Sequence, residues 1–325
     1  MTRVTVAIIG GGTSNEHDVS LASAAAAASA LDPGRYEVVS LTIDRDGRWL
    51  DSAGCDRGFA HAMGELSRCD VVLPLVHGPH GEDGQLAALC ESADVPYAGS
   101  GVAAGAIAMD KHVTKLLAET VGVATAPGIL LDRSGAHTYT FTGPVVVKPV
   151  ASGSSVGVAL VSEESQLAGA IRAAFEHDTR VLVEDVIMGR EIDVAVMRRV
   201  DGSFIVSPAL EIRADGLFDT DAKYGGSADF VVPAQLDDVA RTRLEDAALS
   251  VYQVLGCAGL ARIDFFVTSD GPVLIEANTT PGFTAQSQVP RMFDVIGIDY
   301  SALLDLLIEE ALSRPRRQPA KAVIM

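Results

Sequence analysis

Short apolar runs alternate with longer amphipathic stretches over the first hundred residues. The pattern predicts strands at Val4–Ile9, Glu37–Ile43 and Val71–Val76, with helices at Val19–Leu31 and Gln85–Ala93. Strands that alternate with helices in this way are typical of a parallel sheet in an α/β protein. We expect this unit to end near residues 97–101, where an Ala-Gly-Ser-Gly run breaks the pattern.

Further helices and strands are predicted after this break. Helices are expected at Lys111–Val121 and Ala240–Leu255, and a last amphipathic helix precedes a basic, proline-containing tail. Strands are expected at Val145–Lys148, Val181–Asp185, Glu191–Met197, Ile205–Ile212, Leu260–Thr268 and Val273–Asn278. Residues 213–234 hold Gly, Asp, Ser and Tyr without a period, and a connection of this length indicates a functional loop.

Charge and cysteine usage narrow the classes of partner and compartment. The 325 residues carry a net charge of −18, and such a surface repels nucleic-acid backbones and anionic lipid heads. The four cysteines form no CxxC pair and no zinc-binding spacing, so we expect reduced thiols. Met1 leads directly into the first strand without a signal-peptide pattern, and no apolar run is long enough for a bilayer. We therefore expect a cytoplasmic protein that binds neither nucleic acid nor membrane.

The segment from Ala261 to Asn278 reads as a β-hairpin with acidic residues on both strands. If Thr268 pairs with Pro272 around a three-residue turn, Asp264 lies opposite Glu276 and Arg262 lies opposite Asn278. Side chains alternate along a strand, so all four point to the same face. Two carboxylates about 5 Å apart repel each other by roughly 4 kcal/mol at an intermediate dielectric.

Such a pair of carboxylates favours a bound cation. Oxygen ligands from two carboxylates and an amide suit Mg²⁺ or Mn²⁺ better than zinc. The alternative is a solvated hairpin in which Arg262 and the acids form a salt-bridge network. The apolar residues of the two strands indicate a partly buried hairpin, which favours the metal hypothesis: Leu260, Ile263, Phe265, Leu274 and Ile275.

A second chemical signal is a lysine that ends a strand and is followed by a loop of glycine and serine. Lys148 precedes the loop Ser152–Gly157, which can offer backbone N–H groups and hydroxyls to phosphate oxygens. The alternative is a surface loop beside a lysine whose ammonium reaches solvent. No P-loop motif occurs, and in the glycine turn Gly10–Gly12 the third position of a dinucleotide fingerprint falls on Asn15. An NAD site is therefore the less favoured hypothesis.

The motifs taken together resemble the D-alanine–D-alanine ligase family of the ATP-grasp superfamily. The resemblance covers nearly the whole chain, and its order and spacing are more specific than any single motif. It rests on Gly11–Ser20, His77–Gly84, Tyr97–Gly101, Met109–Lys111, Val147–Pro149, Gly153–Gly157, Ala222–Tyr224, Arg262–Asp264 and Glu276–Gly282.

This resemblance implies an α/β protein with an ATP-grasp fold and an N-terminal Rossmann-like domain. The expected units are residues 1–100, a central subdomain at 101–185, a C-terminal subdomain at 186–313 and a disordered tail at 314–325. The implied activity is ATP-dependent joining of two D-alanines through an acylphosphate, for peptidoglycan synthesis. ATP, two Mg²⁺ or Mn²⁺ ions and a homodimer are implied with it.

The resemblance also implies roles for single residues. It assigns ATP binding to Lys111, Lys148, Ser155, Glu184, Ile187, Glu191 and Lys223, with the phosphates on Lys111 and Lys148, the adenine on Glu184 and the ribose on Glu191. It assigns metal binding to Asp264, Glu276 and Asn278. Catalysis falls to Glu16, Ser154, Tyr224 and Arg262, and substrate binding to Glu16, His77, Arg262, Gly282, Ser287 and Gln288.

Taken alone, several of these residues have simpler readings. Glu16 is compatible with an acid at a helix N-terminus, and His77 with a buried, hydrogen-bonded core histidine. Lys223 and Tyr224 lie on the long loop, which is expected to act as a lid. Gln288 stands where the family usually has leucine near the second substrate, so an acceptor other than D-alanine remains open. A dehydrogenase and a non-catalytic nucleotide-binding module are the hypotheses from other classes.

Overall fold

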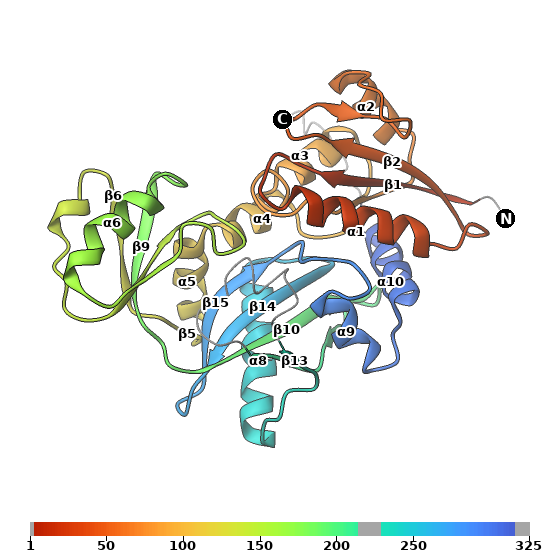
Figure 1. The fold of residues 1–325 in the computed structure, drawn as a ribbon. Coiled ribbons are helices and arrows are strands. Elements are labelled where there is room, and N and C mark those ends of the chain that lie inside the picture. Colours follow the sequence, from red (N-terminus) through yellow and green to blue (C-terminus); the bar gives the residue numbers. More distant parts are fainter. Residues whose placement is uncertain (1–2, 214–228, 316–325) are drawn as a thin grey trace, which may run out of the picture.

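The computed structural model describes residues 3–213 and 229–315, and the chain forms three sheets in that part (Figure 1). The N-terminal sheet has the order β3-β2-β1-β4, with β1 (Val4–Gly11), β2 (Tyr36–Ile43) and β4 (Val71–Pro74) parallel. Helices α1 (His17–Ala30) and α3 (Gln85–Ser92) follow as the periodicity predicts. The short strand β3 (Trp49–Leu50) and helix α2 (Phe59–Leu66) are elements that the sequence pattern missed.

The turn after β1 requires glycine for a steric reason. Gly11 has a φ of +90°, and a Cβ atom there would lie 2.1 Å from the carbonyl oxygen of Ile43. A side chain is therefore excluded both by the backbone conformation and by the neighbouring strand. The close approach brings the start of α1, with Glu16, to the carboxyl ends of the parallel strands.

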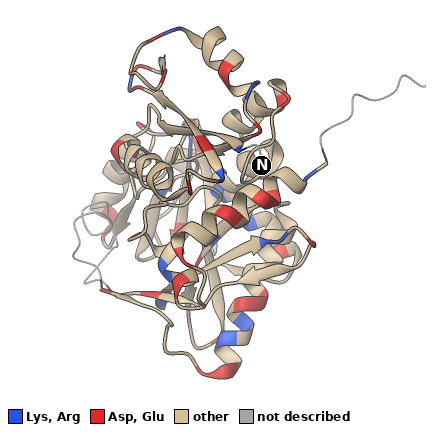
Figure 2. Ribbon diagram, turned by 90° about the vertical axis from the view of Figure 1, so that its right-hand side faces the viewer, with Lys and Arg blue, Asp and Glu red and all other residues tan. Residues whose placement is uncertain are grey.

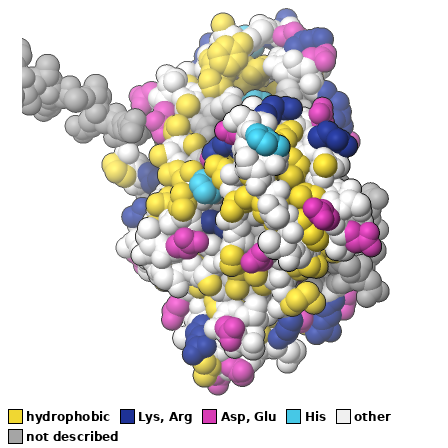
Figure 3. Space-filling view, turned by 90° about the vertical axis from the view of Figure 1, so that its left-hand side faces the viewer, with side chains coloured by type: hydrophobic (Ala, Val, Ile, Leu, Met, Phe, Trp, Pro, Cys, Tyr) yellow, Lys and Arg dark blue, Asp and Glu magenta, His cyan; other side chains and the backbone are white. Residues whose placement is uncertain are grey.

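A small antiparallel sheet forms the lobe on the left of Figure 1. Its order is β6-β9-β7-β8, and α6 (Glu164–Ala174) covers it. The strands are β6 (Gly128–Asp132), β7 (Val145–Pro149), β8 (Ala159–Val161) and β9 (Arg180–Asp185). A 3₁₀ turn at Ala136–Thr138 lies in the connection between β6 and β7. On the face of the molecule in Figure 3, acidic and basic side chains are interspersed with apolar ones.

The large sheet has the order β13-β12-β10-β14-β15-β5, and β11 pairs with β10 beside this path. Helix α8 (Asp238–Val254) packs on it through Leu244, Val251 and Tyr252, which share a core with Ile263 and Phe265. The strands are β5 (Ala124–Thr125), β10 (Arg190–Arg198), β11 (Phe204–Val206), β12 (Leu210–Arg213), β13 (Asp229–Val231), β14 (Leu260–Val267) and β15 (Pro272–Asn278). Helices α4 (Val102–Met109) and α5 (Lys111–Thr120) also lie against this sheet.

The expected single strand at Ile205–Ile212 is wrong. The structure has two strands there, β11 and β12, separated by Ser207, Pro208 and Ala209. Proline has no N–H to donate to a ladder, and the Ser207 hydroxyl accepts the N–H of Ala195 at 2.9 Å in place of a backbone partner. The apolar run therefore continues through the break, whereas the ladder does not.

The last helices return the chain to the N-terminal sheet. Helix α9 (Gln288–Asp294) and helix α10 (Tyr300–Ser313) follow the large sheet, and α10 packs against α1 and β4 (Figure 1). Leu303, Leu304 and Leu307 share one buried cluster with Val71 and Leu73 of β4. Acidic residues are spread over the helices and loops of the chain (Figure 2). No helix in the described ranges is long and apolar enough to cross a membrane.

Arg314 links the end of α10 to the loop at Tyr97–Gly99. Its guanidinium donates to the carbonyl oxygens of Tyr97 and Gly99 at 2.7 and 2.8 Å and lies 3.0 Å from the Glu310 carboxylate. Glu310 is only 2% exposed, and burial raises the pKa of its carboxyl. Arg314, expected as the first residue of a tail, is thus an anchored residue, while residues 316–325 lie outside the described part.

Replacing Arg314 with Ala is expected to lower the free energy of unfolding by about 3 kcal/mol, because it leaves a buried carboxylate without its nearest cation. Urea denaturation measures the loss. Adding Glu310→Gln should recover part of it, and Arg243→Ala on the exposed side of α8 serves as the control. Equal losses in the two single arginine variants would contradict the anchoring role.

Candidate active site

The hairpin of β14 and β15 has the predicted register where its chemistry lies. Arg262 pairs with Asn278 and Asp264 pairs with Glu276. The predicted turn is wrong, because Val267 rather than Thr268 pairs with Pro272. A β-bulge at Ile275, between the pairs Asp264–Glu276 and Phe265–Leu274, restores the register. The bulge thus aims both carboxylates at one face.

Arg262 is held by three side chains at the centre of this face. Its Nε and Nη2 donate to the two oxygens of Asp264, each at 2.7 Å, and its Nη1 donates to Gln288 Oε1 at 2.6 Å. Its Nε also lies 3.3 Å from Asp193 Oδ2. Burial alone would lower the pKa of the guanidinium, but Asp264 and Asp193 raise that pKa well above its ordinary value. Arg262 is therefore a fixed, permanently charged donor.

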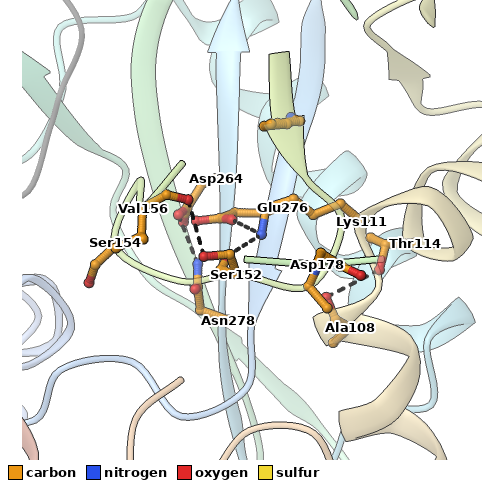
Figure 4. A network of polar contacts seen from close by, with 12 residues as sticks. Ala108, Lys111, Thr114, Ser152, Ser154, Val156, Asp178, Asp264, Glu276 and Asn278 are labelled. Atoms are coloured by element: carbon orange, nitrogen blue, oxygen red, sulfur yellow. Dashed lines mark hydrogen bonds and ion pairs between the residues drawn. The ribbon is translucent and has the colours of Figure 1, made fainter. Parts of the chain in front are cut away.

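The second acid of the hairpin contacts a lysine from helix α5. Lys111 Nζ lies 3.1 Å from Glu276 Oε2 and donates to the carbonyl oxygen of Ser152 at 2.8 Å (Figure 4). Asn278 donates to Asp264 Oδ2 at 2.9 Å. Lys111 is 9% exposed, so its ammonium is directed into the site rather than to solvent.

The donor set of the hairpin fits a magnesium-like ion. Asp264 and Glu276 face each other across the strands, and Asn278 adds an amide beside them. These are hard oxygen donors, which Mg²⁺ prefers. The described ranges contain no group of three or more His, Cys, Asp and Glu side chains around a common metal position, so a metal would rely on the asparagine and on non-protein oxygens.

The residues predicted to bind nucleotide lie at the junction of the small and large sheets. Lys148 on β7 contacts Glu184 on β9, with Nζ 2.6 Å from Oε2, and both are buried. Ile187 lies on the segment that leads from β9 into β10, and Glu191 lies near the start of β10. Burial would raise the pKa of the Glu184 carboxyl, but Lys148 and Lys115 bring it below its usual value.

Glu16 meets the serine loop that follows Lys148. Ser154 Oγ donates to Glu16 Oε1 at 2.5 Å, and the carboxylate lies close to the Cα positions of Gly78 and Gly153. Ser154 and Ser155 have φ values of +49° and +57°, a conformation that costs energy for residues with side chains. A cavity of about 250 Å³ adjoins this contact, with Asn15, Ser154 and His177 in its lining. Lys223 and Tyr224 lie outside the described residues.

His77 is fully engaged by the protein. Its Nδ1 lies 2.8 Å from the carbonyl oxygen of Thr280, and its Nε2 lies 2.9 Å from Ser23 Oγ. Burial lowers the pKa of the imidazole. This is the geometry of a hydrogen-bonded core histidine, and a contact with substrate would have to replace one of these partners.

The residues predicted for the second substrate lie in the turn before α9. Ser287 Oγ accepts the N–H of Thr284 at 3.0 Å, and Gly282 lies beside the same hydroxyl. Gln288 begins α9 and contacts Arg262 directly. Gln288, where the sequence departs from the family pattern, is thus in direct contact with Arg262.

Three residues of the site were missed by the sequence reasoning: Asp193, Lys115 and Glu82. Asp193 had a signal, because it is an acid within the apolar run Glu191–Met197. It is 1% exposed and lies opposite Asp264 in the sheet. Lys115 follows Lys111 by one helical turn, and Glu82 lies within the histidine-containing motif His77–Gly84.

Replacing Glu82 with Gln is expected to raise stability at alkaline pH. Burial and then Glu16 raise the pKa of Glu82 from 4.5 to about 8, although the Gly78 N–H donates to it at 2.9 Å. Above pH 4.5 the unfolded chain loses this proton while the folded state keeps it, so stability falls as pH rises toward 8.

The variant should match the wild type at pH 4.5 and exceed it above pH 8 by at most about 5 kcal/mol, at 1.36 kcal/mol per pKa unit. Thermal unfolding of the ligand-free protein across this range measures the difference, with the exposed Glu176→Gln as control. A constant offset between the Glu82→Gln and wild-type curves would contradict the assignment.

The sequence of this chain matches family models and known proteins along most of its length. The family model for the C-terminus of D-ala D-ala ligase matches residues 120–309, and the model for its N-terminus matches residues 5–62 and 55–100. The D-alanine–D-alanine ligase of Nocardia farcinica is 41% identical over 96% of this chain and 98% of its own length. The chain belongs to the D-alanine–D-alanine ligase family.

Solved structures of the same family confirm the predicted fold class. The VanG D-Ala:D-Ser ligase of Enterococcus faecalis superposes with a TM-score of 0.83 at 33% identity, covering 95% of this chain and 100% of its own. The D-alanine–D-alanine ligase of Bacillus anthracis in complex with ATP superposes with a TM-score of 0.78 at 28% identity, over 95% and 97% of the two chains. The protein is therefore an ATP-binding ligase of the D-alanine–D-alanine ligase family.

Proposed function

We propose that this protein is a cytoplasmic ATP-dependent ligase that joins two D-alanines and so supplies D-alanyl-D-alanine for peptidoglycan. The observation that carries the proposal is the face of the hairpin, where Arg262 is fixed between acids and lies beside the predicted acceptor turn. The family membership supports the substrate assignment, since relatives that are named D-alanine–D-alanine ligase match 96% of the chain.

The first step transfers a phosphoryl group to the first D-alanine. A carboxylate oxygen of D-alanine forms a bond to the γ-phosphorus of ATP, and the bond from that phosphorus to the ADP oxygen breaks. Lys111 and Lys148 supply positive charge for the phosphates, and Glu16 binds the ammonium of the first D-alanine. Bound at Asp264, Glu276 and Asn278, two Mg²⁺ ions would neutralise phosphate charge.

The second step forms the peptide bond. The amine of the acceptor attacks the carbonyl carbon of the acylphosphate, phosphate leaves with the C–O bonding electrons, and the amine loses a proton. Arg262 points its guanidinium at the developing oxyanion, a role that suits a donor already held in place by Asp264. Gly282 and Ser287 bind the carboxylate of the acceptor.

The test is phosphate release from ATP and Mg²⁺ with D-alanine alone, with products identified by mass. Formation of D-alanyl-D-alanine supports the proposal. Absence of phosphate release with D-alanine and with a panel of other D-amino acids would leave a non-catalytic nucleotide-binding module. Light scattering on the same preparation tests the homodimer that the family membership supports.

A second acceptor has one specific observation in its favour. Gln288 places a polar side chain on Arg262, and a D-Ala:D-Ser ligase is among the similar structures. A half-buried amide near the acceptor favours a substrate whose side chain forms hydrogen bonds. If D-alanyl-D-serine exceeds D-alanyl-D-alanine at equal acceptor concentrations, the alternative replaces the first proposal.

Replacing Gln288 with Leu is expected to lower the ratio of D-serine to D-alanine incorporation by about tenfold, since one lost hydrogen bond is worth roughly 1.4 kcal/mol. Competition with equal amounts of the two acceptors measures the ratio by mass. Gln286→Leu, an exposed neighbour two residues earlier, is the matched control. An unchanged ratio would remove Gln288 from the acceptor site.

A further inference from the structure

Two buried lysines share one buried carboxylate behind the predicted nucleotide site. Lys115 on α5 contacts Glu184 Oε1, and Lys148 on β7 lies 2.6 Å from Glu184 Oε2. The three side chains are between 5% and 10% exposed. Lys115 Nζ also donates to the carbonyl oxygen of Ala126 at 2.6 Å, on the segment that leads into β6. The cluster therefore has one more positive than negative charge within the protein.

The arrangement resolves a conflict in the proposed roles of Lys148 and Glu184. Lys148 is proposed to contact phosphate, and to do so it must give up at least part of its contact with Glu184. A buried carboxylate that loses its only cation is strongly destabilised. Lys115 removes this obstacle, because it remains on the other carboxylate oxygen when Lys148 moves.

Lys111 would likewise have to leave a carboxylate in order to contact phosphate, but there a bound metal ion can replace its charge. Lys111, one helical turn before Lys115, contacts Glu276, which is also a proposed metal ligand. A cation bound at the hairpin would take over the charge of Glu276 when Lys111 turns to phosphate. Among the described residues no metal ligand set adjoins Glu184, so the protein itself has to supply the second cation there.

We propose that Lys115 is a positioning residue for ATP binding: it holds the Glu184 carboxylate charged and in place so that Lys148 can transfer to the phosphates. Lys115 itself does not touch the nucleotide in this scheme. Its contact with Ala126 fixes the ammonium to the backbone beside Gly128, which packs against Glu184. The inference rests on the proposed roles of Lys148 and Glu184 toward ATP.

The experiment is a double-mutant cycle read by calorimetric binding of ATP with Mg²⁺, without D-alanine. Lys115→Met is expected to raise the Kd for ATP by about tenfold to a hundredfold. In a Glu184→Gln background, which has no buried carboxylate to neutralise, the same change should alter the Kd by less than about threefold. Lys115→Arg keeps the charge and should stay within about fivefold of the wild type.

Steady-state assays separate a positioning role from a general loss of structure. The KM for ATP should rise in Lys115→Met, while its KM for D-alanine stays nearly constant. The melting temperature of Glu184→Gln should be nearly the same with and without Lys115→Met. Equal Kd increases in both backgrounds, or equal increases in both KM values, would overturn the inference. If Lys115→Met folds only together with Glu184→Gln, the Kd of Lys115→Arg decides: loss of ATP binding overturns the proposal. A wild type that binds ATP but forms no dipeptide would refute the proposed function alone.

Discussion

Replacing Arg262 with Lys is expected to lower the turnover number for phosphate release by about 10²- to 10³-fold, the usual effect of losing one fixed donor to a developing oxyanion. A lysine keeps the charge, but its single ammonium cannot bind both Asp264 oxygens and Gln288 at once. The donor that faces the reacting carbonyl would therefore lose its fixed orientation.

Phosphate release at saturating ATP and D-alanine measures this effect, and calorimetry should show an ATP affinity within about tenfold of the wild type. Arg243→Lys, on the exposed part of α8, is the matched control. If the Arg262→Lys variant turned over as fast as this control, Arg262 would be a structural residue of the hairpin only.

Replacing Glu276 with Gln is expected to raise the Mg²⁺ concentration for half-maximal activity at least about tenfold and to lower the turnover number by about 10²-fold. The amide keeps the shape of the side chain but removes one of the two facing charges, and it also removes the partner of Lys111. A Mg²⁺ titration of the rate measures the first effect directly.

The two roles of Glu276 are separable in this experiment. If Glu276 acts only as the partner of Lys111, the affinity for ATP changes while the Mg²⁺ requirement does not. Glu176→Gln, an exposed acid after α6, controls for the loss of one surface charge. An unchanged Mg²⁺ requirement would thus remove Glu276 from the metal ligands.

Local patterns predicted much of the fold. Alternating strands and helices identified the parallel sheet of β1, β2 and β4, because their periods of 2 and 3.6 residues are properties of the chain itself. The shortest elements escaped, since two-residue strands such as β3 and β5 carry no period. Pro208 divided a strand that hydropathy alone would continue, because an apolar residue without an N–H looks the same as any other in such a pattern.

The hairpin shows both the reach and the limit of sequence reasoning. The opposition of Asp264 and Glu276 followed from strand alternation, whereas the bulge at Ile275 and the shorter turn, in which Thr268 pairs with Gly271, did not. The register at the acids nevertheless agrees, because the turn has one residue fewer than predicted and the bulge adds one residue to β15.

The sequence by itself determined the family, the alternation of elements and the residue types that carry the chemistry, because these depend on local order and spacing. Only the tertiary structure decided which charges neutralise one another. Lys115 and Glu184 are 69 positions apart, Arg262 lies between Asp193 and Asp264 from two strands, and Arg314 contacts the loop at Tyr97. A buried charge is stabilised by whichever opposite charge the packing places beside it. Local patterns in the sequence do not show which residues far apart along the chain come into contact.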